Sequence, residues 1–102
     1  MGMISKLSKS QLQSYIRRVA VESSRLAFTE HALQQMNRRH ITREMAAEVV
    51  RMGVLKRTPE PNHAKGSLEC RMERYVAGRD LGVVVAVSDE EPNLIIVTAM
   101  VL

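Results

Sequence analysis

The stretch that decides the fold is residues 68–87, LECRMERYVAGRDLGVVVAV. Apolar and polar side chains alternate over residues 68–76, and this period of two is typical of a half-buried strand. Gly-Arg-Asp at residues 78–80 indicates a turn, and residues 81–87 are apolar on both faces, which predicts a central strand. Because the turn is too short for a crossover, we expect these two strands to pair antiparallel.

The strands on either side of this hairpin are predicted from the same signals. Residues 94–101 follow a second polar turn and predict the closing strand. Residues 54–58 predict a short first strand, which two prolines end. The loop at 59–67 is polar and rich in turn residues, so we expect it to be flexible. The sequence therefore predicts four strands.

Before residue 54 the apolar period is that of a helix. The pattern predicts helices over about 9–23 and 30–38, and a third between Thr42 and Gly53. The candidate N-caps are Ser8 or Ser10, Thr29 and Thr42. We expect an α+β fold in which three N-terminal helices pack on one face of a four-stranded antiparallel sheet and leave the other face partly open.

Composition limits the classes of protein. A chain of 102 residues with 45% apolar residues has room for one compact domain, whose core must rest on aliphatic side chains and methionine because only 3% of residues are aromatic. The single Cys70 excludes an internal disulfide, fits a reducing cytoplasm, and is predicted to be a buried small apolar residue. The longest apolar run has seven residues, where a membrane helix needs about 20, so we expect no membrane segment.

Charge is divided unevenly along the chain. The formal net charge is +4, but residues 1–58 hold eleven Lys and Arg and four Asp and Glu, so the remainder is acidic. A basic half can attract a polyanion such as RNA. Its arginines include a series at Arg38, Arg39, Arg43 and Arg51, with Arg57 beyond them. If these arginines converge they form a surface for a sugar-phosphate backbone, and if they radiate they only solvate the helices.

The polar face of the 68–76 strand carries the strongest local signal for chemistry. Its row is Glu69, Arg71, Glu73 and Tyr75, and residues two apart stand about 6.5 to 7 Å apart on one surface. Such a row offers a carboxylate base, a guanidinium for phosphate and a ring for stacking, which are groups that RNA cleavage by 2′-hydroxyl attack requires. Arg74 falls on the apolar side of the alternation. The alternative is a solvent-facing strand with cross-strand ion pairs.

His31 is the other candidate catalytic group. It falls in the first turn of the second predicted helix, where the helix dipole favours the uncharged imidazole that could act as a base or donate to phosphate. The alternative is a structural histidine. Three His and one Cys without recognisable ligand spacing predict no metal site, and no cofactor motif is present.

Two short motifs resemble those of a known family. Residues 28–32, FTEHA, and 36–42, MNRRHIT, are similar to the opening helix and following link of a small bacterial family of unknown function, numbered 4258. Glu69 and Arg71, Gly78 and the strands that follow also fit, so the resemblance covers about residues 26–101. It divides the chain into an N-terminal helical extension, 1–25, and a domain, 26–102.

The resemblance also implies a fold and an activity. That family is thought to be similar in fold to the RelE and BrnT ribonuclease toxins, with helices on an antiparallel sheet and RNA at the exposed face. In BrnT-like proteins a Glu-x-Arg on a middle strand lies at the proposed active face, and Glu69-Cys70-Arg71 occupies the corresponding place. The lysine-rich catalytic set of RelE-type enzymes has no clear match.

Two functions follow as hypotheses. The first is a metal-independent, toxin-type endoribonuclease in which Arg71 and Arg74 face phosphate, Glu69 or His31 is the base, and Tyr75 completes the row. The second is a non-enzymatic module of the same fold that binds nucleic acid or protein. The expected partners are RNA, an antitoxin-like protein or a second copy of the chain.

Overall fold

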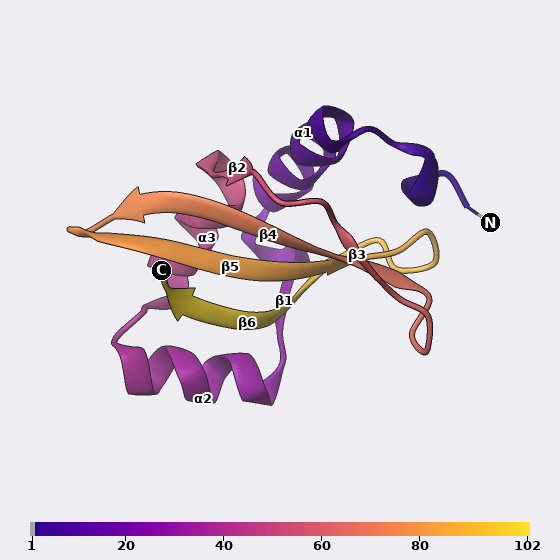
Figure 1. Ribbon diagram of the computed structural model, residues 1–102. Coiled ribbons are helices and arrows are strands. Elements are labelled where there is room, and N and C mark those ends of the chain that lie inside the picture. The colour runs from indigo at the N-terminus through magenta and orange to yellow at the C-terminus, as the bar shows by residue number, and fades with distance from the viewer. Residues whose placement is uncertain (1) are drawn as a thin grey trace.

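The computed structural model describes residues 2–102, which form three α-helices, two single 3-10 turns and six strands (Figure 1). In chain order these are η1 (Ile4–Lys6), α1 (Lys9–Ala20), η2 (Ser23–Arg25), β1 (Leu26–Phe28), α2 (Glu30–Arg39), α3 (Arg43–Met52), β2 (Val54–Leu55), β3 (Glu60–Asn62), β4 (Ser67–Val76), β5 (Arg79–Val87) and β6 (Leu94–Val101). The α+β class predicted from the sequence is confirmed.

Each α-helix begins at a side-chain cap. The hydroxyl of Ser8 accepts from the Gln11 N–H, that of Thr29 from the Ala32 N–H, and that of Thr42 from the Met45 N–H. These bonds satisfy amide groups that the first turn of a helix leaves without partners. The predicted caps are therefore confirmed, with Ser8 rather than Ser10 beginning α1.

The sheet is mixed and has six strands, so the prediction of four antiparallel strands was wrong. The strand order is β1-β6-β5-β4-β2, with β3 also paired to β4, and β1 runs parallel to β6. The two missed strands, β1 and β3, have three residues each, too few to show a period. β3 also contains Pro61, whose ring nitrogen has no hydrogen to donate. An edge strand tolerates this because its outer side has no neighbouring strand to bond.

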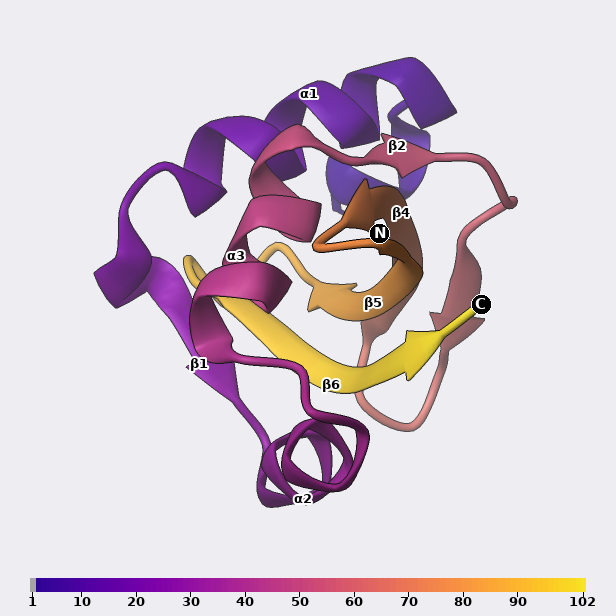
Figure 2. The same ribbon diagram turned by 90° about the vertical axis from the view of Figure 1, so that its left-hand side faces the viewer.

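The three α-helices do not all lie on the same side of the sheet. Figure 2 shows α1 and α3 together on one side of the curved sheet, whereas α2 lies beside β6 at its edge. The prediction that all three helices pack on one face was therefore wrong. The prediction that all helices precede the strands was also wrong, because β1 comes before α2. Two contacts hold α2 beside β6. β1, which leads into α2, pairs with the start of β6, and Arg39 of α2 donates to the Ala99 carbonyl farther along that strand.

One continuous core joins all layers. It contains Leu12 and Ile16 of α1, Val49 of α3, and Met72 of β4, each fully or almost fully buried. Cys70 is also fully buried, as predicted, and its burial raises the pKa of the thiol to about 12. A thiol in such surroundings carries no nucleophilic thiolate at neutral pH.

Candidate functional site

The polar row of β4 lies on the side of the sheet away from α1 and α3. Cys70 and Met72 are buried in the core, so the residues that alternate with them point the opposite way. The row is flanked by β5, with Glu69 opposite Ala86, Arg71 opposite Val84, Glu73 opposite Gly82 and Tyr75 opposite Asp80. We name the surface formed by these eight residues the uncovered face.

Arg71 is held by Glu73 at the centre of the uncovered face. Its Nε and Nη2 both donate to Glu73 Oε2, at 3.0 and 2.8 Å, and the two side chains are only 19% and 11% exposed. Arg71 and Glu73 therefore pair along β4, whereas the alternative drawn from the sequence was ion pairs between neighbouring strands. The remaining guanidinium nitrogen, Nη1, has only the Met100 sulfur, at 3.9 Å, as a hydrogen-bond partner among residues 2–102.

Gly82 makes room for this ion pair. A Cβ built at Gly82 would stand 3.0 Å from Leu102 Cδ2, 3.3 Å from Met100 Cγ and 3.4 Å from Arg71 Cδ. The Arg71 side chain therefore crosses β5 at Gly82, the residue of the uncovered face that has no side chain. The sequence pattern showed Gly82 only as part of an apolar strand.

Arg74 lies on the other side of the sheet from Arg71. Its Nε donates to Glu48 Oε2 of α3 at 3.1 Å, and its Nη1 to the Met52 carbonyl at 3.5 Å. The structure does not bring the two arginines together, and Arg74 serves to join β4 to α3.

Tyr75 stands at the far end of the row. It is 65% exposed and lies six positions after Glu69, a distance of about 20 Å along a strand. Groups at that separation cannot act on one scissile bond. The row is therefore divided into two ends, with the Arg71–Glu73 pair between them.

A cavity of about 200 Å³ adjoins Glu69 at its end of the uncovered face. Lys65, from the turn between β3 and β4, and Thr29, the N-cap of α2, line it together with Glu69. Asn62 Nδ2 donates to Glu69 Oε2 at 3.2 Å and fixes the carboxylate. Sequence reasoning missed Lys65 and Thr29 as site residues, because only the fold joins the β3–β4 turn to the start of α2.

His31 follows two residues after Thr29 and is exposed. Gln35 is one turn farther along α2 on the same row of the helix. Gln35 Oε1 accepts from the hydroxyl of Thr98, which pairs with Val84 of the uncovered face. Gln35 therefore lies beside the uncovered face near Val84, opposite Arg71, whereas His31 is not among the residues that line the small cavity.

The predicted basic series does not converge. Arg39 is bonded to the Ala99 carbonyl, and the Arg43 guanidinium lies 5.2 Å from the centre of the Phe28 ring. Arg38 is exposed on α2. Arg57 follows β2, at the opposite edge of the sheet from α2. The basic half of the chain is thus not one basic surface.

Other arginines are used to satisfy carbonyl groups. Arg79 donates to the carbonyls of Arg39 and His40, where α2 ends in a left-handed residue, and Arg25 donates to the Pro92 carbonyl. Charged donors suit the ends of helices, where carbonyls lack partners and the dipole is negative. Within the basic half of the chain, Arg25 and Arg39 are therefore held by carbonyl groups of the protein itself.

Within residues 2–102, no three His, Cys, Asp or Glu side chains gather as metal ligands would. In the same part of the chain, no helix is both long and apolar enough to cross a bilayer.

Comparison with known proteins places the chain in a family. A family model described as "Domain of unknown function (DUF4258)" matches residues 28–101. Neither the curated proteins nor the solved structures contain a match to the chain. The matched residues include the small cavity, β4 and α2, whereas α1 and η1 precede them.

Proposed function

Because the chain belongs to the DUF4258 family, whose function is unknown, we propose its function from the site itself: a metal-independent endoribonuclease that acts at the uncovered face. The observation that carries the proposal is the cavity shared by Glu69, Lys65 and Thr29. It places two carboxylates, those of Glu69 and Glu91, an ammonium group and a helix N-terminus around one small space. These include a proton acceptor and two features that attract a phosphate, beside a second carboxylate that bonds the Asn93 N–H.

The proposed reaction is an attack by the ribose 2′-hydroxyl on the adjacent phosphorus. Glu69 takes the hydroxyl proton, the 2′-oxygen forms a bond to phosphorus, and the bond to the 5′-oxygen breaks. Lys65 gives the 5′-oxygen its proton, since its ammonium group is a donor on a flexible stem. The products are a 2′,3′-cyclic phosphate and a 5′-hydroxyl, so atoms and charges balance.

Two other residues bind the phosphates of the substrate and transfer no proton. An N–H of His31, beside the start of α2, donates to a non-bridging phosphate oxygen. Nη1 of Arg71 has no oxygen partner among residues 2–102, so it can donate to a neighbouring phosphate of the same strand. Because Glu73 already balances the charge of Arg71, this contact adds little long-range attraction.

The test compares purified wild type with Glu69→Gln and Lys65→Arg on end-labelled RNA, in buffer containing EDTA. Glu69→Gln keeps an oxygen for Asn62 but loses the base, and Lys65→Arg keeps the charge but loses the readily transferred proton. We expect cyclic-phosphate products from wild type and at least a hundred-fold slower cleavage by each variant. Exposed Glu44→Gln on α3 is the matched control and should cleave like wild type. No cleavage by wild type, or equal cleavage by Glu69→Gln, contradicts the proposal.

A second candidate function, a protein-binding module, is favoured by an observation at the other end of the row. Seven large apolar residues have exposed side chains among residues 2–102, and four of them line one cavity of about 460 Å³. These four are Met52, Val54, Tyr75 and Leu102. Gathered exposed apolar side chains mark surfaces that bind protein. A homodimer or a complex with a co-expressed antitoxin-like partner that Tyr75→Ser dissociates, measured by sedimentation, would support this function.

A further inference from the structure

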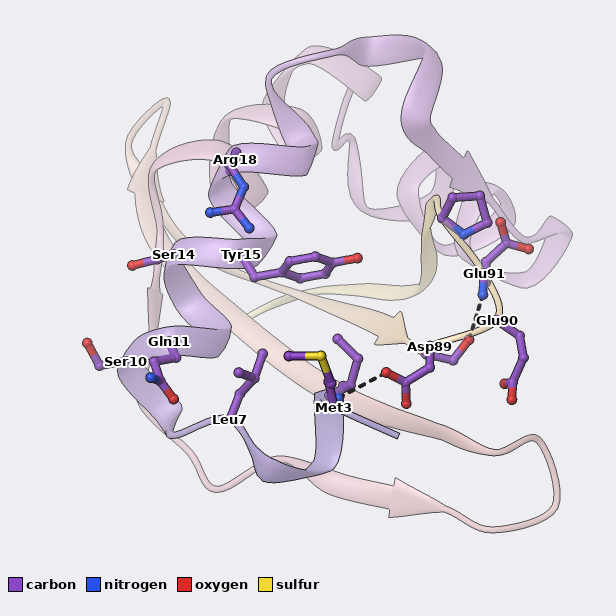
Figure 3. Close-up of a pocket in the computed structure, with 13 residues that line it drawn as sticks. Met3, Leu7, Ser10, Gln11, Ser14, Tyr15, Arg18, Asp89, Glu90 and Glu91 are labelled. Atoms are coloured by element: carbon purple, nitrogen blue, oxygen red, sulfur yellow. Dashed lines mark hydrogen bonds between the residues drawn. The ribbon is translucent and has the colours of Figure 1, made fainter. Parts of the chain in front are cut away.

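A larger cavity adjoins the proposed RNA site, with which it shares Ser88 and Glu91 of the turn between β5 and β6. It has a volume of about 690 Å³ and is lined by η1, α1 and the turn between β5 and β6 (Figure 3). The helical walls come from residues before the family match, and the turn comes from within it. The site is therefore one that the N-terminal segment adds to the family domain.

The two walls are fastened together. The Ile4 N–H donates to Asp89 Oδ1 at 3.1 Å, and a Cβ on Gly2 would stand only 1.7 Å from Asp89 Oδ2. Within the turn, the Ser88 hydroxyl accepts from the Glu91 N–H at 3.2 Å. The cavity is thus formed before any ligand arrives, which lowers the entropy lost on binding.

One side of the cavity is apolar. Met3, Leu7 and Tyr15 line it, and Met3 is 74% exposed. In Figure 3 the ring of Tyr15 points from α1 across the space toward the turn, with Met3 and Leu7 to one side of it. A ligand that covers these side chains removes apolar surface from water.

The opposite side is acidic. Asp89, Glu90 and Glu91 line the cavity from the turn. Asp89 and Glu91 each use one oxygen on a backbone N–H, whereas the Glu90 carboxylate has no hydrogen-bond partner within residues 2–102. The cation on the far wall is Arg18, whose guanidinium lies 5.6 Å from the centre of the Tyr15 ring. The two ends of the cavity therefore differ in sign.

We propose that this cavity binds a small amphipathic organic cation, an apolar chain or ring that ends in an amine or guanidine. The volume lies within the range of about 300 to 1,000 Å³ that small-molecule sites occupy. The apolar body lies on Met3, Leu7 and Tyr15, and the cationic group lies at the carboxylates. Arg18 repels the cation from the other end, so the ligand has one orientation.

The test is an NMR titration of the ¹⁵N-labelled full chain with 4-phenylbutylamine, and separately with 4-phenylbutanoate, which has the same ring and stem but the opposite charge. We expect saturable amide shifts around both Leu7 and Glu90 with the amine, and at least ten-fold weaker binding of the acid. Equal binding of the two probes, no saturable shift, or shifts at the turn without any at Leu7 or Tyr15 would overturn the proposal.

Three variants locate the site. Glu90→Gln should weaken amine binding several-fold, and Ser14→Trp, on the exposed side of α1, should fill the cavity and abolish it. Exposed Glu22→Gln removes a charge outside the cavity and should bind like wild type. Tighter binding of a hexa-arginine peptide, with shifts confined to residues 88–92, would show a surface for basic peptides and overturn the small-ligand proposal. RNA cleavage is not a readout, so these results are independent of the proposed nuclease.

Discussion

Arg17 and Arg51 fasten α1 and α3 to each other reciprocally. Arg17 of α1 donates from Nε and Nη2 to the carbonyl of Gly53, which follows the end of α3, at 2.9 and 2.6 Å. Arg51 of α3 donates from Nε to the carbonyl of Ala20, the last residue of α1, at 2.6 Å, and from Nη2 to the Ser23 hydroxyl. Each helix thereby caps the C-terminal end of the other.

The first prediction concerns these caps. Arg17→Lys keeps the charge but loses the planar fork, so we expect the free energy of unfolding to fall by about 2 kcal/mol, the value of a hydrogen bond from a charged group. Urea denaturation followed by circular dichroism measures it. Arg18→Lys is the control, because Arg18 is exposed and bonds no carbonyl among residues 2–102; it should change stability by less than about 0.5 kcal/mol. Equal losses in both variants would contradict the role given to Arg17.

A second prediction addresses the ion pair on the uncovered face. Removing either partner leaves the other charge largely buried, so Arg71→Met and Glu73→Gln should each destabilise the protein by about 1 to 3 kcal/mol. The double variant should lose less than the sum, with a coupling energy of about 1 to 2 kcal/mol in a double-mutant cycle. Strict additivity would mean that the two side chains do not interact in solution.

The third prediction is steric. Gly82→Val should destabilise the protein by about 1 to 3 kcal/mol, because its branched side chain must displace Arg71, Met100 and Leu102. Gly82→Ala should have a much smaller effect, since its nearest contact is the end of a flexible leucine. Thermal unfolding separates the two variants, and a valine variant as stable as wild type would show that the arginine does not cross at this position.

The fourth prediction is a dependence on pH. Burial raises the pKa of Cys70 from its ordinary value of 9.0 to about 12, so above pH 9 the unfolded chain gives up a proton that the folded chain keeps. The unfolded state then binds fewer protons, and stability falls as pH rises between 9 and 12, by up to about 1.4 kcal/mol per pH unit. Guanidinium titrations of wild type and Cys70→Ala at pH 8 and 10 measure this. Identical pH dependence in the two proteins would refute it.

The candidate site could be predicted only in part, and the reason is separation along the chain. The alternation of β4 predicted that Glu69, Arg71, Glu73 and Tyr75 share a face, and the structure confirms it. The same alternation placed Arg74 on the core side, where it bonds α3. No local pattern could show that Lys65 and Thr29 line a cavity with Glu69, because pairing of β1 with β6 carries the start of α2 there.

Interactions between residues a few positions apart determined where the helices of this protein begin and which faces its strands present. Side-chain caps at Ser8, Thr29 and Thr42 begin the helices, and a period of two sets the faces of β4. The tertiary structure decided where charge is free to act. The sequence supplies a net charge of +4, but whether an arginine attracts RNA or satisfies a carbonyl depends on which helix end lies within its reach. That distance is fixed by packing between segments 30 or more residues apart, as for Arg17 and Gly53, and not by the residues beside each arginine.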